Sequence, residues 1–195
     1  MTVAGEVVPE VASMVRTGVA RLVLVGFMGA GKSTVGPLVA RALGWDFVDL
    51  DDEIAGRDGR HPAEIIRRDG IERFRELESK AARELLRREG LVLAMGGGWA
   101  AQPGHMASLG RDSLSVWLKV TPAAALARIR GSAASRPLLA GPDPHAAAAT
   151  LLRRRTTHYR RSTITIETDG RSPDEVAREI LQHPSVKEPD REESE

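Results

Sequence analysis

A glycine-rich stretch near the start of the chain constrains its fold more than any other feature. It reads GFMGAGKST over residues 26–34 and directly follows the apolar run of residues 22–25. In this pattern, G-x-x-x-x-G-K-[ST], glycines let backbone N–H groups turn toward a phosphate, the lysine reaches the β- and γ-phosphates, and the hydroxyl holds Mg²⁺. The sequence therefore predicts a strand, a phosphate-binding loop and a helix. The expected nucleotide contacts are Gly29, Ala30, Gly31, Lys32, Ser33 and Thr34.

The composition fits one globular domain with short extensions. Hydrophobic residues make up 42% of the 195 residues, which is enough for a full core. The net charge of +1 gives no large basic field for nucleic acid, and the absence of Cys excludes disulfides and Cys-based metal sites. The N-terminus lacks the pattern of a signal peptide, and no run approaches the ~20 apolar residues of a membrane span. We expect a cytoplasmic protein with no membrane or nucleic-acid partner.

Predicted strands and helices alternate along the chain. The strands are expected at residues 22–25, 45–50, 91–95, 114–120 and 163–167, and the helices at 33–43, 122–130, 144–161 and 173–182, the last one capped by Ser172. Such alternation is typical of an α/β fold with a parallel sheet and crossover helices.

Four segments depart from this alternation. Residues 1–19 form an N-terminal extension before a domain at 20–183, and the polar tail at 184–195 is expected to be disordered. Residues 52–89 are charged and helical, with breaks near residues 56–62 and 69–70, and predict two or three helices in a separate lobe. Residues 131–142 are rich in small residues and Pro around Arg136. A loop of that length in a compact domain is typical of a lid.

Chemically useful residues follow the predicted strands at their carboxyl ends. Asp49 and Asp51 end the second strand, and the triple glycine Gly96-Gly97-Gly98 ends the third. Ligands bind outside the carboxyl ends of the strands in an open parallel sheet. Phosphoryl transfer needs a metal ion, positive charge around the transferred group and an aligned acceptor hydroxyl. Lys32, Ser33 and Arg136 suit the first two needs, and an acidic group suits the third.

These motifs resemble those of the shikimate kinase family, small relatives of the nucleoside monophosphate kinases. The matching pieces are the phosphate loop, the D-x-D of Asp49 and Asp51, Phe74-Arg75 with Glu78, Gly96-Gly97-Gly98, Arg136-Pro137-Leu138-Leu139, and Arg155 before Tyr159-Arg160. They occur in the family's order. The resemblance implies a three-layer α/β/α fold with a five-stranded parallel sheet, a lid at about residues 131–142, and a small helical substrate-binding lobe at about residues 50–80.

The resemblance also implies an activity, the ATP-dependent phosphorylation of the 3-hydroxyl of shikimate on the way to the aromatic amino acids. ATP, Mg²⁺ and shikimate are the implied ligands, and a monomer is expected. On the nucleotide side, the resemblance implies phosphate binding by Lys32, metal binding by Ser33 and Asp49, closure of Arg136 over the phosphates, and a nucleotide contact from Arg171. On the acceptor side, it implies that Asp51 orients or deprotonates the hydroxyl and that Arg75 and Arg155 bind the carboxylate. It also implies that the backbone of Gly96, Gly97 and Gly98 lies close to the ring.

Several residues keep a second interpretation. Asp51 has the right type and place to be a helix cap instead, and Arg75 and Arg155 each lie among charged neighbours, as surface residues do. Trp99, after the triple glycine, either reshapes the substrate pocket or packs below it. Arg128 and Arg130 are equal candidates to stack on adenine, opposite the loop at 169–173.

Three other functions compete with shikimate phosphorylation. A related kinase acting on gluconate or another hydroxy acid would use the same phosphate loop with different acid-binding arginines. A nucleotide-binding regulatory module without turnover would need a broken catalytic position, whereas Lys32, Ser33, Asp49, Asp51 and Arg136 are all present. The arginine-rich segment 153–161 has few aromatic neighbours, which disfavours nucleic-acid binding.

Overall fold

The computed structural model describes residues 19–129 and 143–186, which fold around a five-stranded parallel sheet. The order across the sheet is β2-β3-β1-β4-β5. The strands are β1 (Arg21–Val25), β2 (Asp46–Asp49), β3 (Leu91–Ala94), β4 (Ser113–Lys119) and β5 (Ile164–Glu167). All four strand pairings are parallel, with Leu22 opposite both Val92 and Leu114. The predicted sheet is confirmed.

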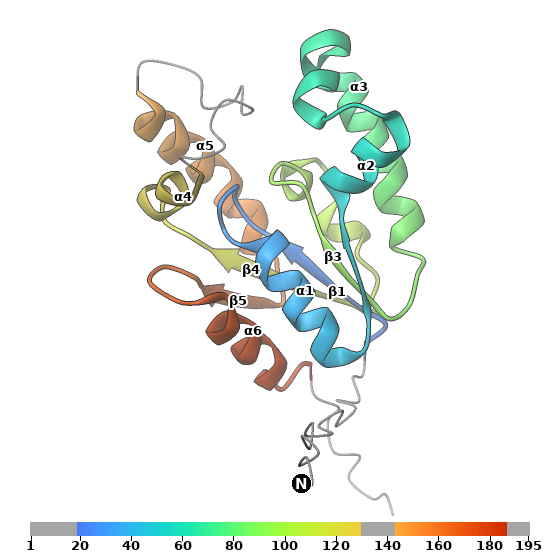
Figure 1. The fold of residues 1–195 in the computed structure, drawn as a ribbon, viewed down its shortest axis with the longest axis vertical. Helices are drawn as coiled ribbons and strands as arrows, with labels where there is room; N and C mark the ends of the chain where they lie inside the picture. The colour runs from blue at the N-terminus through green and yellow to red at the C-terminus, as the bar shows by residue number, and fades with distance from the viewer. Residues whose placement is uncertain (1–18, 130–142, 187–195) are drawn as a thin grey trace, which may run out of the picture.

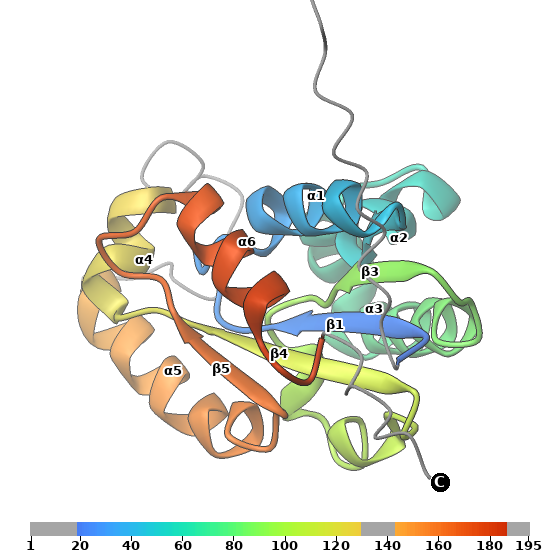
Figure 2. The same ribbon diagram turned by 90° about the horizontal axis from the view of Figure 1, so that it is seen from below.

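Helices cover both faces of this sheet. They are α1 (Lys32–Leu43), α4 (Pro122–Ile129), α5 (Pro144–Tyr159) and α6 (Pro173–Gln182). Helices α1 and α6 pack against each other on one face, and α5 lies on the other (Figure 2). Because both faces are covered, β1 and β3 consist of buried residues throughout, as their apolar runs predict. The predicted cap of α6 is also confirmed, since the Ser172 side chain accepts from the N–H of Glu175 in a capping box.

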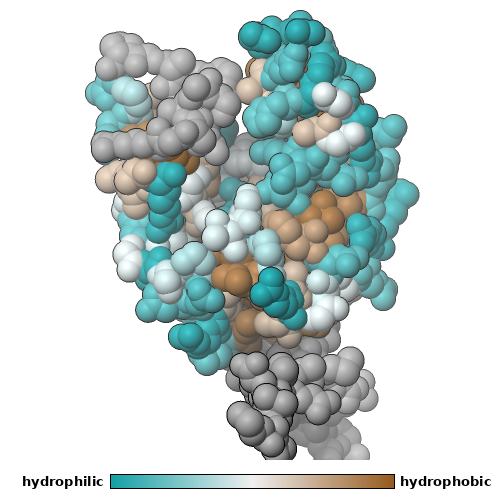
Figure 3. Space-filling view, viewed as in Figure 1, coloured by the Kyte–Doolittle hydropathy of each residue, from teal (hydrophilic) through white to brown (hydrophobic). Residues whose placement is uncertain are grey.

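The charged segment after β2 forms two helices that stand beside the rest of the domain (Figure 1). They are α2 (Leu50–Asp58) and α3 (Pro62–Leu85), and they pack on each other. Helix α3 is interrupted at Gly70, whose φ of 89° is not helical. Hydrophilic residues cover this part of the visible face in Figure 3. The predicted breaks near residues 56–62 and 69–70 therefore correspond to the connection between α2 and α3 and to the interruption of α3 at Gly70.

The connection from β3 to β4 contains two short 3₁₀ turns and no crossover α-helix. They are η1 (Trp99–Ala101) and η2 (Met106–Ser108). Trp99 is 1% exposed and its ring lies 4.7 Å from that of His105. The buried indole thus anchors η1 directly after the triple glycine.

Three predicted segments fall largely outside the described residues. These are the N-terminal extension up to residue 18, the lid including Arg136, and residues 187–195 of the tail. The start of the predicted tail is corrected, because Val186 is completely buried in the core. Within residues 19–129 and 143–186, no helix is long and apolar enough to cross a membrane.

Replacing two helical glycines with alanine should change the stability of the fold in opposite directions. A Cβ added to Gly36 of α1 would overlap the ring of Phe47, whereas one added to Gly56 of α2 meets nothing within 4 Å. We expect Gly36→Ala to lower the free energy of unfolding by about 1 kcal/mol or more through overpacking. Gly56→Ala should raise it by roughly 0.5–1 kcal/mol through helix propensity. Urea unfolding of both variants measures the difference, and equal effects would contradict the packing argument.

Candidate active site

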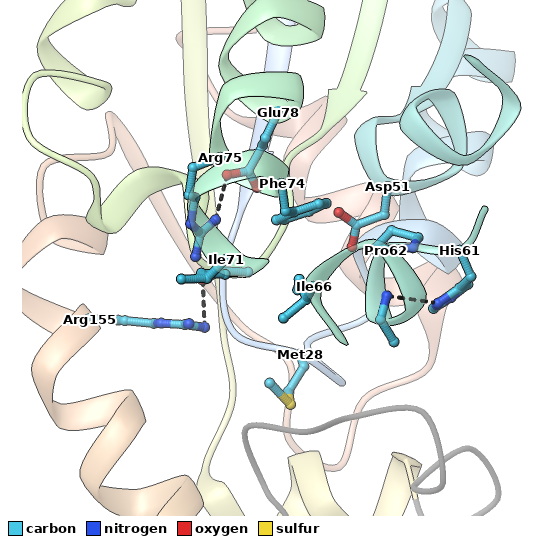
Figure 4. Close-up of a pocket in the computed structure, with 14 residues that line it drawn as sticks. Met28, Asp51, His61, Pro62, Ile66, Ile71, Phe74, Arg75, Glu78 and Arg155 are labelled. Atoms are coloured by element: carbon cyan, nitrogen blue, oxygen red, sulfur yellow. Dashed lines mark hydrogen bonds and ion pairs between the residues drawn. The ribbon is translucent and has the colours of Figure 1, made fainter. Parts of the chain in front are cut away.

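A cavity of about 370 Å³ lies at the carboxyl edge of the sheet, between the phosphate loop, α2, α3 and α5 (Figure 4). Its walls come from the segments that the sequence singled out and from an apolar set beside them. The lining residues are Met28, Asp51, His61, Pro62, Ala63, Ile66, Ile71, Phe74, Arg75, Glu78, Gly96, Gly97, Gly98 and Arg155. Asp51, Arg75, the triple glycine and Arg155 are therefore brought to one cavity.

The phosphate loop connects β1 to α1 as its sequence requires. Gly29 has a φ of 73°, and a Cβ added there would lie 2.7 Å from the carbonyl oxygen of Ala125 in α4, so only glycine fits. Gly31 precedes α1, and no side chain caps the first turn of that helix. The N-terminal N–H groups of α1 thus point where an anion can accept their hydrogen bonds.

Lys32 lies across its own loop. Its Nζ donates to the carbonyl oxygens of Gly26 at 2.9 Å and Phe27 at 3.1 Å. These bonds keep the ammonium group beside the loop rather than extended into solvent. Of the other predicted nucleotide contacts, Ala30 is buried and Thr34 is exposed at the start of α1.

Ser33 and Asp49 face each other at the mouth of the loop. The Ser33 hydroxyl donates to Asp49 Oδ2 at 2.5 Å, and Asp49 Oδ1 accepts from the N–H of Asp51 at 3.0 Å. Asp49 is therefore the N-cap of α2, and the alternative that Asp51 caps this helix is wrong. Asp51 occupies the first turn and lines the cavity.

The donor set at Ser33 and Asp49 fits Mg²⁺. A hydroxyl and a carboxylate are hard oxygen donors, and Mg²⁺ is commonly held by one or two carboxylates together with substrate phosphates. Among residues 19–129 and 143–186, no group of three His, Cys, Asp or Glu residues could hold a metal ion by itself. The protein therefore offers part of a coordination shell beside the phosphate loop.

Arg75 is paired with a buried carboxylate. Its guanidinium forms an ion pair with Glu78, whose side chain is 1% exposed. The guanidinium carbon of Arg75 lies 5.7 Å from the centre of the Phe74 ring. Burial raises the pKa of the Glu78 carboxyl, the charge of Arg75 opposes this rise, and the charge of Asp51 adds to it. Arg75 is thus a cavity-lining residue held by a buried partner. It is not one member of an exposed surface ion pair, which was the second interpretation of the sequence.

Arg155 is buried as well. It is 7% exposed, and its Nη1 donates to the carbonyl oxygen of Gly97 at 2.9 Å. Tyr159, one helical turn later, donates its hydroxyl to the same oxygen. Burial raises the pKa of Tyr159 to about 12, so the phenol remains a donor at neutral pH. The surface interpretation of Arg155 is therefore also wrong.

The triple glycine lets four charged side chains reach one short loop. A Cβ added to Gly96 would lie 2.6 Å from Glu78 Oε1 and 2.9 Å from Asp51 Oδ1. One added to Gly98 would overlap the guanidinium of Arg75. The absence of side chains here thus serves the packing of the charged groups as well as access to the cavity.

Trp99 packs behind the large cavity. It is not among the residues that line the large cavity, and it borders a smaller one of about 160 Å³ together with His105 and residues of α3. Of the two interpretations that the sequence left open, packing below the pocket is correct.

Among the described residues, Arg128 lies in the region expected to hold adenine. Arg128 donates to the carbonyl oxygen of Gly29 at 3.1 Å and to Thr168 Oγ1 at 3.0 Å, so it joins the phosphate loop to the loop after β5. Arg171 donates to the carbonyl oxygens of Glu167 and Glu175 and pairs with Glu179. Arg130 and Arg136 lie outside the described residues. A nucleotide contact from Arg171 stays a prediction.

Sequence reasoning missed two residues of the site, one in the cavity wall and one behind it. His61 lines the cavity and caps α3 through Nδ1, which accepts from the N–H of Ala63 at 3.2 Å. Gln102, which no motif includes, donates to Glu78 at 2.7 Å. Pro62 after His61 was a usable signal for a helix start, whereas nothing near Gln102 in sequence marks its partner.

Comparison with known proteins agrees with this geometry. The family model described as shikimate kinase matches residues 28–184. A shikimate kinase of Moorella thermoacetica is 45% identical over 159 residues, which cover 82% of this chain and 91% of that protein.

Solved structures give the same result. The structure of Acinetobacter baumannii shikimate kinase in complex with shikimate aligns with a TM-score of 0.80 at 36% identity, covering 85% of this chain and 92% of that one. A gluconokinase from Sinorhizobium meliloti aligns with a TM-score of 0.59 at 20% identity over 85% of this chain and 91% of that one, which shows a shared fold alone. The chain belongs to the shikimate kinase family.

Proposed function

We propose that this protein phosphorylates the 3-hydroxyl of shikimate with ATP, giving shikimate 3-phosphate and ADP for aromatic amino acid synthesis. The observation that carries the proposal is the cavity itself. Arg75 and Arg155 lie on one side of it and Asp51 on the other, next to the phosphate loop (Figure 4). A small hydroxy acid bound there has cations for its carboxylate and a base for its hydroxyl.

The two arginines would bind the acceptor carboxylate. A guanidinium matches a carboxylate through paired N–H donors, and the match is strongest where the guanidinium is held still. Glu78 holds Arg75, and Gly97 holds Arg155. The apolar wall formed by Met28, Ile66, Ile71 and Phe74 would pack against the carbon ring. Helices α2 and α3 would therefore act as the substrate-binding lobe.

The phosphate loop would bind ATP. Backbone N–H groups of residues 29–34 and the start of α1 would surround the phosphates, and Lys32 would contact the β- and γ-phosphates. Ser33 and Asp49 would hold Mg²⁺, which when bound neutralises charge on the β- and γ-phosphate oxygens. The resemblance to the family adds Arg136 over the phosphates and Arg171 beside the adenine, opposite Arg128 or Arg130.

Asp51 would orient the acceptor hydroxyl and take its proton. The hydroxyl oxygen forms a bond to the γ-phosphorus, the bond from that phosphorus to the β–γ bridging oxygen breaks, and ADP leaves with the electron pair. Because Asp49 already caps α2, the Asp51 carboxylate is not needed for that role. One chain supplies all these groups, so we propose that it acts as a monomer.

The activity is tested by coupled ADP release with shikimate, with gluconate and without acceptor. We expect turnover with shikimate well above both other reactions, because two fixed cations and Asp51 converge on the cavity. Equal rates with and without shikimate would contradict the proposed function, and a preference for gluconate would favour the related hydroxy-acid kinase.

Arg75→Ala should chiefly weaken acceptor binding. Loss of a charge-assisted hydrogen bond pair predicts an increase of about 10- to 100-fold in the shikimate KM. The ATP KM should change little. Arg73→Ala is the matched control, since Arg73 lies on the same helix but pairs with Glu76 at the exposed surface. Steady-state kinetics decide the matter, and an unchanged shikimate KM in Arg75→Ala would refute the carboxylate assignment.

Asp51→Asn should chiefly slow the transfer step. Removal of a general base predicts a decrease in kcat of roughly 10²- to 10⁴-fold. Unfolding stability should stay near that of the parent, because the cap of α2 is Asp49. Asp52→Asn, at the neighbouring exposed position, serves as the control. A kcat for Asp51→Asn within a few-fold of the parent would rule out the role of Asp51 in proton transfer.

A further inference from the structure

Gln102 contacts the buried carboxylate that holds Arg75. Its Nε2 donates to Glu78 Oε2 at 2.7 Å, and the same oxygen accepts from Arg75. Glu78 Oε1 is buried without a hydrogen-bond partner. Of the described side chains, Gln102 therefore provides the neutral donor that supports Glu78 beside its charged partner.

Glu78 needs such support because its surroundings oppose its charge. Burial disfavours the ionised carboxyl, and Asp51 of α2 adds like-charge repulsion. Arg75 and the hydrogen bond from Gln102 both favour the ionised form. If Glu78 took up a proton, the guanidinium of Arg75 would lose the anion that fixes its position.

The position of Gln102 depends on the buried indole next to the triple glycine. Gln102 is the C-cap residue directly after η1, and its N–H donates to the carbonyl oxygen of Trp99. Trp99 is buried, and its ring packs at a tilt of 42° against the ring of His105, which holds the turn in place. A rigid connection therefore runs from Trp99 through η1 to the amide of Gln102.

We propose that Gln102 is a positioning residue for acceptor binding, which acts through Glu78 to keep Arg75 aimed into the cavity. The inference rests on the proposed function, because it assumes that Arg75 receives the carboxylate of shikimate. It also gives Trp99 a role, as the anchor of the turn that carries Gln102.

The test is Gln102→Met, which keeps the side-chain length and removes the donor. Loss of a hydrogen bond to a charged group predicts an increase of about tenfold in the Kd and KM for shikimate. The ATP KM should stay close to that of the parent, and the protein should stay folded with a melting temperature lower by about 2–6 °C, because a hydrogen bond to a buried carboxylate is lost. Isothermal titration with shikimate measures the Kd without turnover.

The pH profile supplies a second readout. Shikimate affinity is present where Glu78 is ionised and is lost as the pH falls through the pKa of this carboxyl. Because the lost hydrogen bond favoured the ionised form, the acidic limb of shikimate affinity (1/Kd from titration without turnover, which needs no proton transfer to Asp51) should move to higher pH in Gln102→Met, by about one pH unit. Gln182→Met, at an exposed position of α6, should leave the limb unchanged.

A double-mutant cycle with Glu78→Gln tests whether the effect of Gln102 on acceptor binding passes through Glu78. If Gln102 acts through Glu78, Gln102→Met should add no further change in the Glu78→Gln background. Equal effects in both backgrounds, or an unmoved acidic limb, would overturn the positioning role. Failure of the parent protein to bind or phosphorylate shikimate would overturn the proposed function and this role with it, whereas normal parent activity with an unaffected Gln102→Met would overturn this role alone.

Discussion

The parallel pairing of β2, β3 and β1 is the constraint on which the rest of the structure depends. Neighbouring parallel strands end at the same edge of the sheet, so the phosphate loop, the Asp49 to Asp51 turn and the triple glycine must lie side by side. Parallel strands need covered faces, which the helices provide. The same topology that satisfies the backbone therefore places a nucleotide loop beside a carboxylate and a glycine-lined cavity.

Charge burial around the triple glycine is the second determinant of the site. Glu78 and Arg155 are both buried, and Arg75 is partly so. Buried charges are costly unless they are paired and hydrogen-bonded, so each of these groups has a fixed partner. This rigidity is useful in a binding site, since a guanidinium that is already oriented loses less entropy when a carboxylate arrives.

The secondary structure followed closely from local signals, while the side-chain partners did not. The capping box at Ser172, the break at Gly70 and the buried apolar strands are each legible within a few residues of sequence. Gln102 and Glu78 are 24 positions apart, and their contact depends on how η1 folds back on α3. Arg155 looked like one of several surface arginines because its burial depends on packing against Gly97 across 58 positions.

The sequence by itself determined the fold class, the nucleotide loop and the family, because each of these rests on short motifs whose spacing has a local physical cause. It also indicated Asp49 and Asp51 as candidate site residues. It did not decide whether Asp51 caps a helix or contacts the acceptor. Only the tertiary structure decided that Asp49 caps α2, that Trp99 packs behind the cavity, and that Glu78, Gln102 and Arg75 form one group. The reason is physical: a hydrogen-bond partner, a degree of burial and a shifted pKa are properties of neighbours in space, which the order of residues along the chain does not specify.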